Sequence, residues 1–500
     1  MSLTGVGGWR RWVENGQYCY IADLVLSPPH QLETAASQRT SMSHSIFPRL
    51  SRLPAFLLGL ALVGHGVVAL RAADTAEAVV PPPDAGALLI GSNWWHGGIS
   101  TKIDDLAKGL HLKVIRIGGT GYDRRLPSRE TLLEWVRRIR AMGAEPLLQV
   151  SQYAPAEQAA ELVRFFNRDP AAGAPIRHWS IGNEPWLQNR KPALSGLAAQ
   201  IEKYFKPIAV AMKSVDPTIA IYGPDECDFF EDVYGDLFGG AHDIAVQVPG
   251  KKYFYCDGIT WHRYPQTNGE PGMVEIEDLR MRMDHCQTLV ERVNQRHGRT
   301  GADALVWGIT EFNANSGKLV HSFGNGQLFG AALGYAGHYG ARIATSWSLY
   351  ESAGNRGKTD FGLFDGRNLV PRPSFWHLGF LSEFGARPVA LRVSHPSVLG
   401  FSARTGNRTQ IILMAVGTKA PLSFTLSPEA IGDQQENQVS ITIDPGTRIR
   451  LQGTLAPTST QVLSFVDGAL AERITYDQVM FQSGQEPNRE VITQREGNAP

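Results

Sequence analysis

The sequence contains few cysteines for its length. Four occur in 500 residues, no two of them form a CxxC pair, and Cys19 lies upstream of the segment interpreted below as an export signal. The remaining three, Cys227, Cys256 and Cys286, are an odd number. This usage excludes a disulfide-rich scaffold and a cysteine zinc site, and it allows one disulfide at most. Cys227 with Cys256 is the favoured pair, because both lie near the ends of neighbouring predicted strands.

An excess of charge of either sign is also missing. The 48 Lys and Arg residues balance 48 Asp and Glu residues, and we find no internal repeat and no low-complexity tract. A chain without a basic surplus is not expected to have nucleic acid or an anionic membrane as its main partner. With 43% hydrophobic and 19% charged residues the chain can bury a large core, so we expect a globular protein of one to three domains.

Long apolar runs are rare, with one exception near the N-terminus. Residues 1–41 are polar and irregular, and two arginines then precede an apolar stretch at 53–70. Together with the small residues that follow it, this order is typical of a secretory signal, which we place at 42–73 with Met42 as a candidate start. A single membrane anchor is the alternative. Both interpretations predict an extracytoplasmic protein, secreted or periplasmic, and after signal removal no stable membrane insertion is expected.

After a Pro-rich linker at 79–86, short apolar runs alternate with helical patterns such as SRETLLEWVRRIRAMG, in which Ser128 fits an N-cap. Eight such β/α units predict a (β/α)8 TIM barrel over 87–385. A doubly wound open sheet is the alternative, disfavoured because no Gly-rich phosphate fingerprint follows the first run. The eight runs are 87–95, 113–119, 145–151, 178–185, 218–226, 257–265, 305–313 and 341–351.

The pattern changes after residue 385. Short β-type runs separated by turn residues predict a C-terminal antiparallel β-sandwich domain at 386–468. Its phenylalanines, Phe401, Phe424 and Phe465, fit core positions, so we expect the sandwich to pack against the barrel rather than to act as an independent binding module. Residues 469–500 are expected to form a polar tail without regular elements.

Two carboxylates end predicted barrel strands. The fourth run, HWSIGNEPW, ends at Glu184, and the seventh, GITEFN, ends at Glu311, 127 residues further on. The C-terminal ends of barrel strands converge on one mouth, so both side chains are expected to face one cavity. Carboxyl groups about 5 to 5.5 Å apart support a retaining double displacement on a glycosidic bond. Glu184 is then the predicted general acid/base and Glu311, kept ionised, the predicted nucleophile.

Four motifs resemble those of the retaining glycoside hydrolases of clan A, the 4/7 superfamily, with its acid/base on strand four and its nucleophile on strand seven. The resemblance spans about residues 87–350 and implies an enzyme that hydrolyses a carbohydrate, without a cofactor and without a metal. The motifs are GNEP at 182–185, TWHRYPQ at 260–266, ITEFN at 309–313 and TSW at 345–347.

The same resemblance implies roles for four further residues. Asn183 would bind the sugar 2-hydroxyl, and Trp347 would form the floor of the subsite that holds the attacked ring. His262 and Tyr264, which end the sixth strand, would orient the nucleophile or contact sugar. The residue types suit these roles, since an amide is a two-way hydrogen-bonding group, a tyrosine can donate to a carboxylate, and a Trp face packs on sugar C–H groups.

Position alone suggests three more candidates near the mouth. Arg116 ends the second run, where a cation can steady the ionised nucleophile; a structural ion pair with Glu226 or Asp123 is the alternative. Two tryptophans are candidates for stacking on sugar rings, with core packing as the alternative for each. These are Trp95 and Trp186.

The substrate is less sharply defined, because no single type accounts for all motifs. IRIGGTGYD resembles the heparanase and β-glucuronidase group, whereas GPDE, WHRYPQ and ITEFN resemble the endoglucanase and xyloglucanase types and the arabinofuranosidase and xylosidase types. We predict a neutral plant or algal β-glycan, although arginines near the mouth suit a uronic acid, namely Arg116, Arg124, Arg125 and Arg263. The alternatives are an exo-acting glucuronidase or arabinofuranosidase and a non-catalytic carbohydrate-binding protein, which has no need of two buried carboxylates. An inverting mechanism would show as a wide carboxylate separation.

Overall fold

The chain forms two compact units, Met1–Ala72 and Ala73–Pro500. The predicted signal at 42–73 and the linker at 79–86 lie outside the residues that the computed structural model describes. The described residues are 9–14, 17–22, 87–94, 100–189, 193–267, 269–315, 317–351, 360–382, 384, 387–429 and 437–492.

The first unit contains a β-hairpin, in which β1 (Trp9–Glu14) pairs antiparallel with β2 (Gln17–Ala22). The prediction that residues 1–41 hold no regular element is therefore wrong for this segment. Aromatic and β-branched residues flank an Asn-Gly pair at 15–16 in the sequence, a strong short-range hairpin signal that the overall polarity of the segment obscured.

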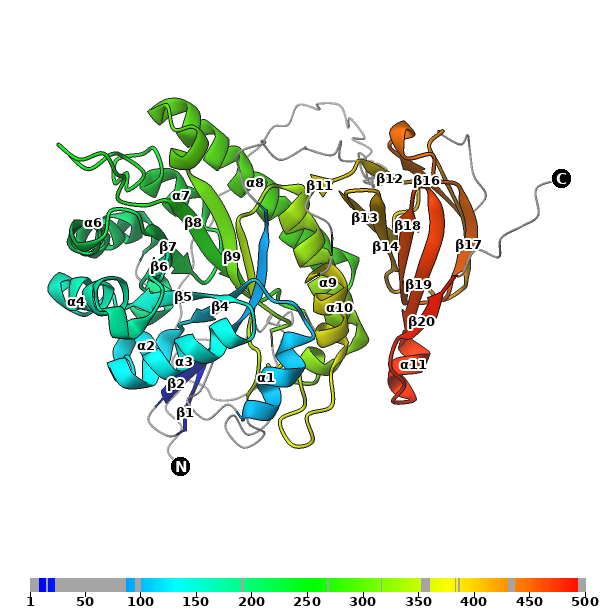
Figure 1. The fold of residues 1–500 in the computed structure, drawn as a ribbon, viewed down its shortest axis with the longest axis horizontal. Helices are drawn as coiled ribbons and strands as arrows, with labels where there is room; N and C mark the ends of the chain where they lie inside the picture. Colours follow the sequence, from blue (N-terminus) through cyan, green and yellow to red (C-terminus); the bar gives the residue numbers. More distant parts are fainter. Residues whose placement is uncertain are drawn as a thin grey trace, which may run out of the picture. The chain divides into compact units, whose positions relative to one another are not determined.

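The second unit begins with eight parallel strands that close into a barrel, coloured blue to green in Figure 1. The order around the barrel is β10-β3-β4-β5-β6-β7-β8-β9, and each predicted run contains one strand, which confirms the (β/α)8 fold. The strands are β3 (Leu89–Trp94), β4 (Val114–Ile117), β5 (Glu145–Val150), β6 (His178–Ile181), β7 (Ala220–Glu226), β8 (Gly258–Arg263), β9 (Val306–Phe312) and β10 (Ile343–Ser346).

Helices connect the strands along the outside of the barrel (Figure 1). The Ser128 hydroxyl caps α3 by accepting from the Thr131 amide, as predicted. No helix among the described residues is both long and apolar enough to cross a membrane. The helices are α1 (Thr101–Lys108), α2 (Thr120–Arg124), α3 (Arg129–Ala141), α4 (Ala156–Arg168), α5 (Pro185–Gln188), α6 (Leu197–Val215), α7 (Glu231–Leu237), α8 (Met273–His297), α9 (Phe323–His338) and α10 (Pro373–Ser382). Short 3-10 turns lie at Pro170–Ala172, Leu194–Gly196, Gly301–Asp303, Gly317–His321 and Pro445–Thr447.

The barrel closes where its last strand, β10, pairs with its first, β3. The Ser92 hydroxyl donates to the Ser346 carbonyl oxygen over 3.1 Å, and the Ser346 hydroxyl lies 3.0 Å from that of Ser92. Asn93 adds a bond from its side-chain amide to the same carbonyl oxygen, at 3.1 Å. Buried side chains, rather than backbone pairing alone, therefore hold the closing seam.

The C-terminal part is a β-sandwich of a six-stranded sheet, β11-β13-β14-β18-β19-β20, and a four-stranded sheet, β12-β16-β15-β17. All neighbouring pairs are antiparallel except β15 with β16, so the predicted sandwich is confirmed. The strands are β11 (Arg387–Pro388), β12 (Leu391–Val393), β13 (Val398–Thr405), β14 (Arg408–Ala415), β15 (Leu422–Ser427), β16 (Gln438–Ile443), β17 (Leu451–Leu455), β18 (Ser459–Val466), β19 (Ala469–Asp477) and β20 (Asn488–Val491), with helix α11 (Gln478–Gln482) between the last two.

The sandwich is longer than predicted. The expected polar tail at 469–500 is wrong as far as Val491, because β19 and β20 extend the six-stranded sheet. In β19 only Ile474 and Tyr476 are buried, and β20 is exposed throughout. Strands with so few buried residues lack the apolar alternation from which strands are recognised in a sequence.

The favoured disulfide is also wrong, because Cys227, Cys256 and Cys286 are all free thiols. Cys256 precedes β8, and its sulfur contacts the carbonyl oxygen of Ile221 near the start of β7. Cys227 instead follows the last residue of β7. Since β7 and β8 run parallel, the two sulfurs lie at opposite ends of the barrel.

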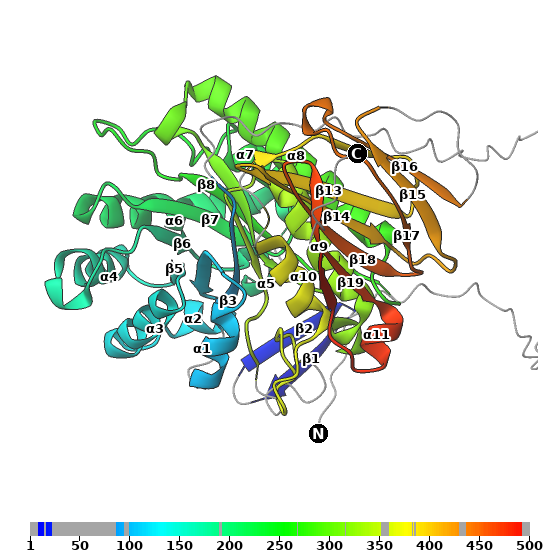
Figure 2. The same ribbon diagram turned by 45° about the vertical axis from the view of Figure 1, so that its right-hand side comes forward.

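Helices α9 and α10 lie between the barrel and the sandwich, as Figure 2 shows. The buried Gln327 side chain of α9 donates to the carbonyl oxygens of Ala415 and Ser459, at 3.0 and 3.1 Å. His377 of α10 lies 2.8 Å from the Thr460 hydroxyl. These bonds join α9 to β14 and β18 and α10 to β18, so the sandwich packs against the barrel as expected.

This interface leads to a stability prediction for α9. A Cβ added at Gly334 would lie 2.5 Å from the Phe401 ring of β13, whereas one at Gly337 would meet only Leu88, at 3.8 Å. Gly334→Ala is therefore expected to lower the free energy of unfolding by about 1–3 kcal/mol through overpacking. Gly337→Ala, the control, is expected to leave it unchanged or to raise it by up to about 1 kcal/mol. Thermal denaturation compares the two, and equal midpoints would contradict the close packing of α9 on β13.

Candidate active site

The segment after β6 turns sharply and places Glu184 at the barrel mouth. Gly182 has a φ of +80°, and Glu184 itself lies in the left-handed region with φ 44° and ψ 55°. Its amide donates to the Asp225 carbonyl oxygen at 2.8 Å, and Pro185 then begins α5. A left-handed glutamate is uncommon, so the contacts that hold this turn determine where the carboxyl lies.

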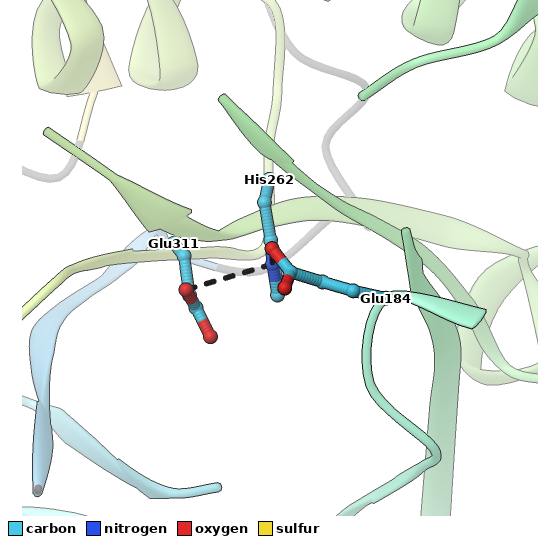
Figure 3. Close-up of side chains that lie close together, drawn as sticks. All are labelled: Glu184, His262 and Glu311. Atoms are coloured by element: carbon cyan, nitrogen blue, oxygen red, sulfur yellow. Dashed lines mark hydrogen bonds and ion pairs between the residues drawn. The ribbon is translucent and has the colours of Figure 1, made fainter. Parts of the chain in front are cut away.

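Glu184 and Glu311 face each other, with His262 of β8 beside both (Figure 3). His262 Nδ1 lies 3.1 Å from Glu184 Oε1 and 3.6 Å from Glu311 Oε2. One carboxylate oxygen of each glutamate lies within 4.8 Å of the other. Burial lowers the pKa of His262 to about 4, so the imidazole is uncharged at neutral pH, and its hydrogen bond goes to Glu184 while Glu311 lies beyond hydrogen-bond distance.

Both oxygens of Glu311 accept hydrogen bonds. Arg116 Nη1 donates to Oε1 at 2.8 Å, and the Tyr264 hydroxyl donates to Oε2, also at 2.8 Å. Burial raises the pKa of the Glu311 carboxyl, while the Arg116 charge and the Tyr264 hydrogen bond act in the opposite direction. Two donors directed at one carboxylate favour its ionised form and fix its orientation.

Arg116 joins the nucleophile candidate to the rest of the barrel interior. Its side chain is fully buried and forms ion pairs with Glu311 and Asp225. The structure thus places Arg116 on the predicted nucleophile, and the alternative partners, Glu226 and Asp123, are wrong. Its other acceptors are the side-chain oxygens of Asn93, Gln149 and Asn183, at 3.0, 3.2 and 2.7 Å.

Asn183 is held from several sides. Its side-chain oxygen accepts from the Arg116 guanidinium, and its side-chain amide donates to the Thr120 hydroxyl at 3.2 Å. Its carbonyl oxygen accepts from the side chains of Gln152 and Gln188, at 3.2 and 2.7 Å, and both of these also donate to Asp123. Burial raises the pKa of Asp123 to about 6, although the hydrogen bonds that it accepts from Gln152 act to lower this pKa. This network fixes the residue that precedes Glu184.

The predicted aromatic residues lie in different surroundings. Trp347, directly after β10, is 5% exposed, and its indole N–H donates to Glu351 at 3.1 Å. Trp186, two residues after Glu184, is half-buried, and its ring centroid lies 5.4 Å from that of Phe230. Trp95 lies outside the described residues. Of the two that the structure describes, Trp186 is more accessible than Trp347.

Asp225, Asn93 and Gln149 complete the site and were not predicted. Asp225 is fully buried, accepts from the Thr310 hydroxyl at 2.6 Å and pairs with Arg116, whose charge helps to outweigh burial and holds the pKa of Asp225 below its ordinary value. Asn93 and Gln149 are isolated polar residues near the ends of apolar runs. Such a polar residue at a strand end is the signal that identifies mouth residues in a barrel.

A cation at this site would compete with existing donors. Glu184, His262 and Glu311 form the group of the described residues whose donor atoms lie close enough to bind one metal ion. However, Arg116 and Tyr264 already donate to the two oxygens of Glu311. A guanidinium at 2.8 Å repels a second cation, so this arrangement favours hydrogen bonding over metal coordination.

The sequence matches no protein-family model and no curated protein. Solved structures similar to this one include a family 51 α-L-arabinofuranosidase from Bifidobacterium longum, with 13% identity, 78% of this chain and 97% of that chain covered, and a TM-score of 0.55. For an α-L-arabinofuranosidase from Thermotoga maritima the identity is 15%, the alignment covers 78% of this chain and 98% of that chain, and the TM-score is 0.52. For a glucosidase from Croceicoccus marinus the identity is 13%, the alignment covers 77% of this chain and 98% of that chain, and the TM-score is 0.53. The chain therefore shares the fold of these proteins over almost their whole length.

Proposed function

We propose that this protein is a retaining glycoside hydrolase of clan A, with Glu184 as acid/base and Glu311 as nucleophile. The observation that carries the proposal is the pair of carboxylates whose nearest oxygens lie within 4.8 Å of each other. A retaining enzyme needs a short separation, whereas an inverting enzyme needs about 6.5–9.5 Å to admit a water molecule. The clan A motifs in the sequence and the fold of the similar structures support the same reaction.

The surroundings of the two carboxylates suit two different roles. In the first step Glu311 attacks the anomeric carbon, the bond to the leaving oxygen breaks, and Glu184 gives that oxygen its proton. Arg116 and Tyr264 favour the ionised form of Glu311 against the effect of burial, and they fix the direction of its carboxylate before the attack. In the second step Glu184 takes a proton from water, which attacks the same carbon and releases Glu311.

The proposed substrate is a neutral β-glycan or an oligosaccharide derived from it, and the predicted signal makes the proposed enzyme secreted or periplasmic. Arg263, one of the arginines that suited a uronic acid, is already paired with Asp228 and Asp278 at 2.8 and 2.5 Å. This weakens the glucuronidase alternative. An exo-acting arabinofuranosidase is the second candidate, because three of the similar structures are named as arabinofuranosidases.

A panel of aryl glycosides tests the proposal and identifies the sugar. We expect hydrolysis of at least one of the 4-nitrophenyl β-D-glucoside, β-D-xyloside, β-D-glucuronide or α-L-arabinofuranoside. Proton NMR of the first product is expected to show retained anomeric configuration, because two successive inversions restore it. Glu311→Gln is expected to abolish turnover, and Glu184→Gln to lower it strongly, without unfolding the barrel. Inverted product, or full activity in either variant, would remove the assignment.

A further inference from the structure

A third glutamate contacts the turn that carries the proposed acid/base. Glu226 ends β7, and its side chain is fully buried, so it does not contact a substrate. Its Oε2 accepts from the Trp186 amide at 2.9 Å, and its Oε1 accepts from its neighbour's amide, that of Cys227, at 2.9 Å. One oxygen is therefore bound by the residue that follows β7, and the other holds the segment that carries Glu184.

The contact with Trp186 satisfies a group that a helix normally leaves without a partner. Trp186 is the second residue of α5, and the amides at the start of a helix have no carbonyl partner within it. The residue before the helix usually supplies the acceptor from its own side chain. Here that residue is Glu184, whose side chain makes no such bond. Glu226 supplies the acceptor from a neighbouring strand instead.

The backbone of β7 completes the support. The Asp225 carbonyl oxygen accepts from the Glu184 amide at 2.8 Å, so two consecutive residues of β7 hold positions 184 and 186. Asp225 has a φ of 55°, the left-handed region, which lets the consecutive side chains of Asp225 and Glu226 serve different partners. The Asp225 side chain pairs with Arg116, which also binds Glu311, whereas the Glu226 side chain accepts from the Trp186 amide in the turn that carries Glu184.

We propose that Glu226 is a positioning residue for the proton donor. By accepting the Trp186 amide it takes over the capping of α5, and the Glu184 carboxyl is directed toward His262 and Glu311 instead of back onto its own helix. This inference rests on the proposed function, since it assigns Glu226 to the proton-transfer half of the reaction and not to the nucleophilic half.

The charge of Glu226 is consistent with this role. Burial raises its pKa to about 8, and the nearby Glu184 charge adds to the shift against the two amide hydrogen bonds. At neutral pH the buried carboxyl is thus largely uncharged and does not repel the ionised form of Glu184 that must act as a base in the second step. A carboxylic acid can still accept both amides while remaining neutral.

The test uses the dependence of the rate on the leaving group. The sugar is the one that the panel of aryl glycosides identifies. Its 2,4-dinitrophenyl glycoside releases a stable phenolate without protonation, whereas its phenyl glycoside needs a proton from the general acid. We expect Glu226→Ala to lower kcat/KM for the phenyl glycoside by roughly 10- to 100-fold, because small misplacements of a catalytic group have effects of that size. For the dinitrophenyl glycoside we expect a change of less than about threefold, since attack by Glu311 is intact.

Two further variants make the outcome decisive. Glu226→Gln keeps the size and one acceptor, so it is expected to show the same selectivity to a smaller degree even if the alanine variant unfolds. Asp257→Asn is the structural control: Asp257 lies at the opposite end of the same strands, where it accepts from the Ile221 amide and pairs with Lys213 at 2.6 Å. It is expected to lower the melting temperature and to affect both glycosides equally.

The reference for selectivity is Glu184→Gln. If this variant discriminates between the two glycosides and the Glu226 variants do not, Glu226 is not a positioning residue and the proposed function stands. If Glu184→Gln itself loses both activities equally, the proposed acid/base role fails first. These two results separate the inference from the function on which it rests.

Discussion

Glu311→Gly is expected to lower hydrolysis of the aryl glycoside by at least about 10⁴-fold, because it removes the group that forms the covalent intermediate. Sodium azide is expected to restore turnover, since the small anion fits the space left by the carboxylate and attacks the anomeric carbon directly. A single displacement inverts the configuration, so NMR should identify a glycosyl azide of the opposite anomeric form.

The matched control is Glu184→Gly with azide. There the nucleophile is intact, azide replaces water in the second step, and the glycosyl azide should retain its configuration. The pair of products therefore assigns each glutamate separately. Retention with the Glu311 variant would remove its role as nucleophile, and equal behaviour of the two variants would contradict the division of roles.

Arg116→Ala is expected to have the largest effect on stability. The guanidinium is fully buried between Glu311 and Asp225, at 2.8 and 3.0 Å, and its loss leaves two buried acidic groups without a cation. Removing one partner of a buried ion pair costs about 3–5 kcal/mol. We expect a marked fall in the unfolding midpoint measured by urea denaturation, together with loss of activity, because Glu311 loses a donor that favours its ionised form and fixes its orientation.

Two variants give this prediction its scale. Arg116→Lys keeps the charge but not the planar arrangement of donors, so it should recover part of the stability and little of the activity. Arg129→Ala removes a surface pair with Glu161, whose side chains are 46% and 49% exposed, and is expected to cost at most about 1 kcal/mol. An Arg116→Ala variant as stable as Arg129→Ala would contradict a structural role for the buried cluster.

The barrel was predictable from the sequence because its strands are buried on both faces. Parallel barrel strands appear as continuous apolar runs, and all eight were located within a few residues of their observed bounds. The mouth residues Glu184 and Glu311 followed from the ends of those runs. The last two strands, β19 and β20, were missed because they bury almost no apolar side chains.

Within the site, prediction was limited by the direction of side chains at strand ends. Asp225 and Glu226 are adjacent in the sequence, yet one binds Arg116 and the other the amide of Trp186. That difference depends on the left-handed backbone at Asp225, which residue types and spacing do not reveal. Likewise, the choice of Cys227 and Cys256 as a pair assumed that nearby strand ends lie on the same side of the barrel.

The seam between β10 and β3 has a consequence for how the chain folds. Ser92 and Ser346 are 254 positions apart, so a growing chain cannot complete the ring until residue 346 has been synthesised. Until then β3 and the latest strand added both present unpaired backbone groups, the kind of edge along which partly folded chains associate. Bonds that span so much of the chain also slow folding, since loop closure must precede them. Truncated chains that end before β10 are therefore expected to aggregate, even though they contain both the Glu184 turn and Glu311.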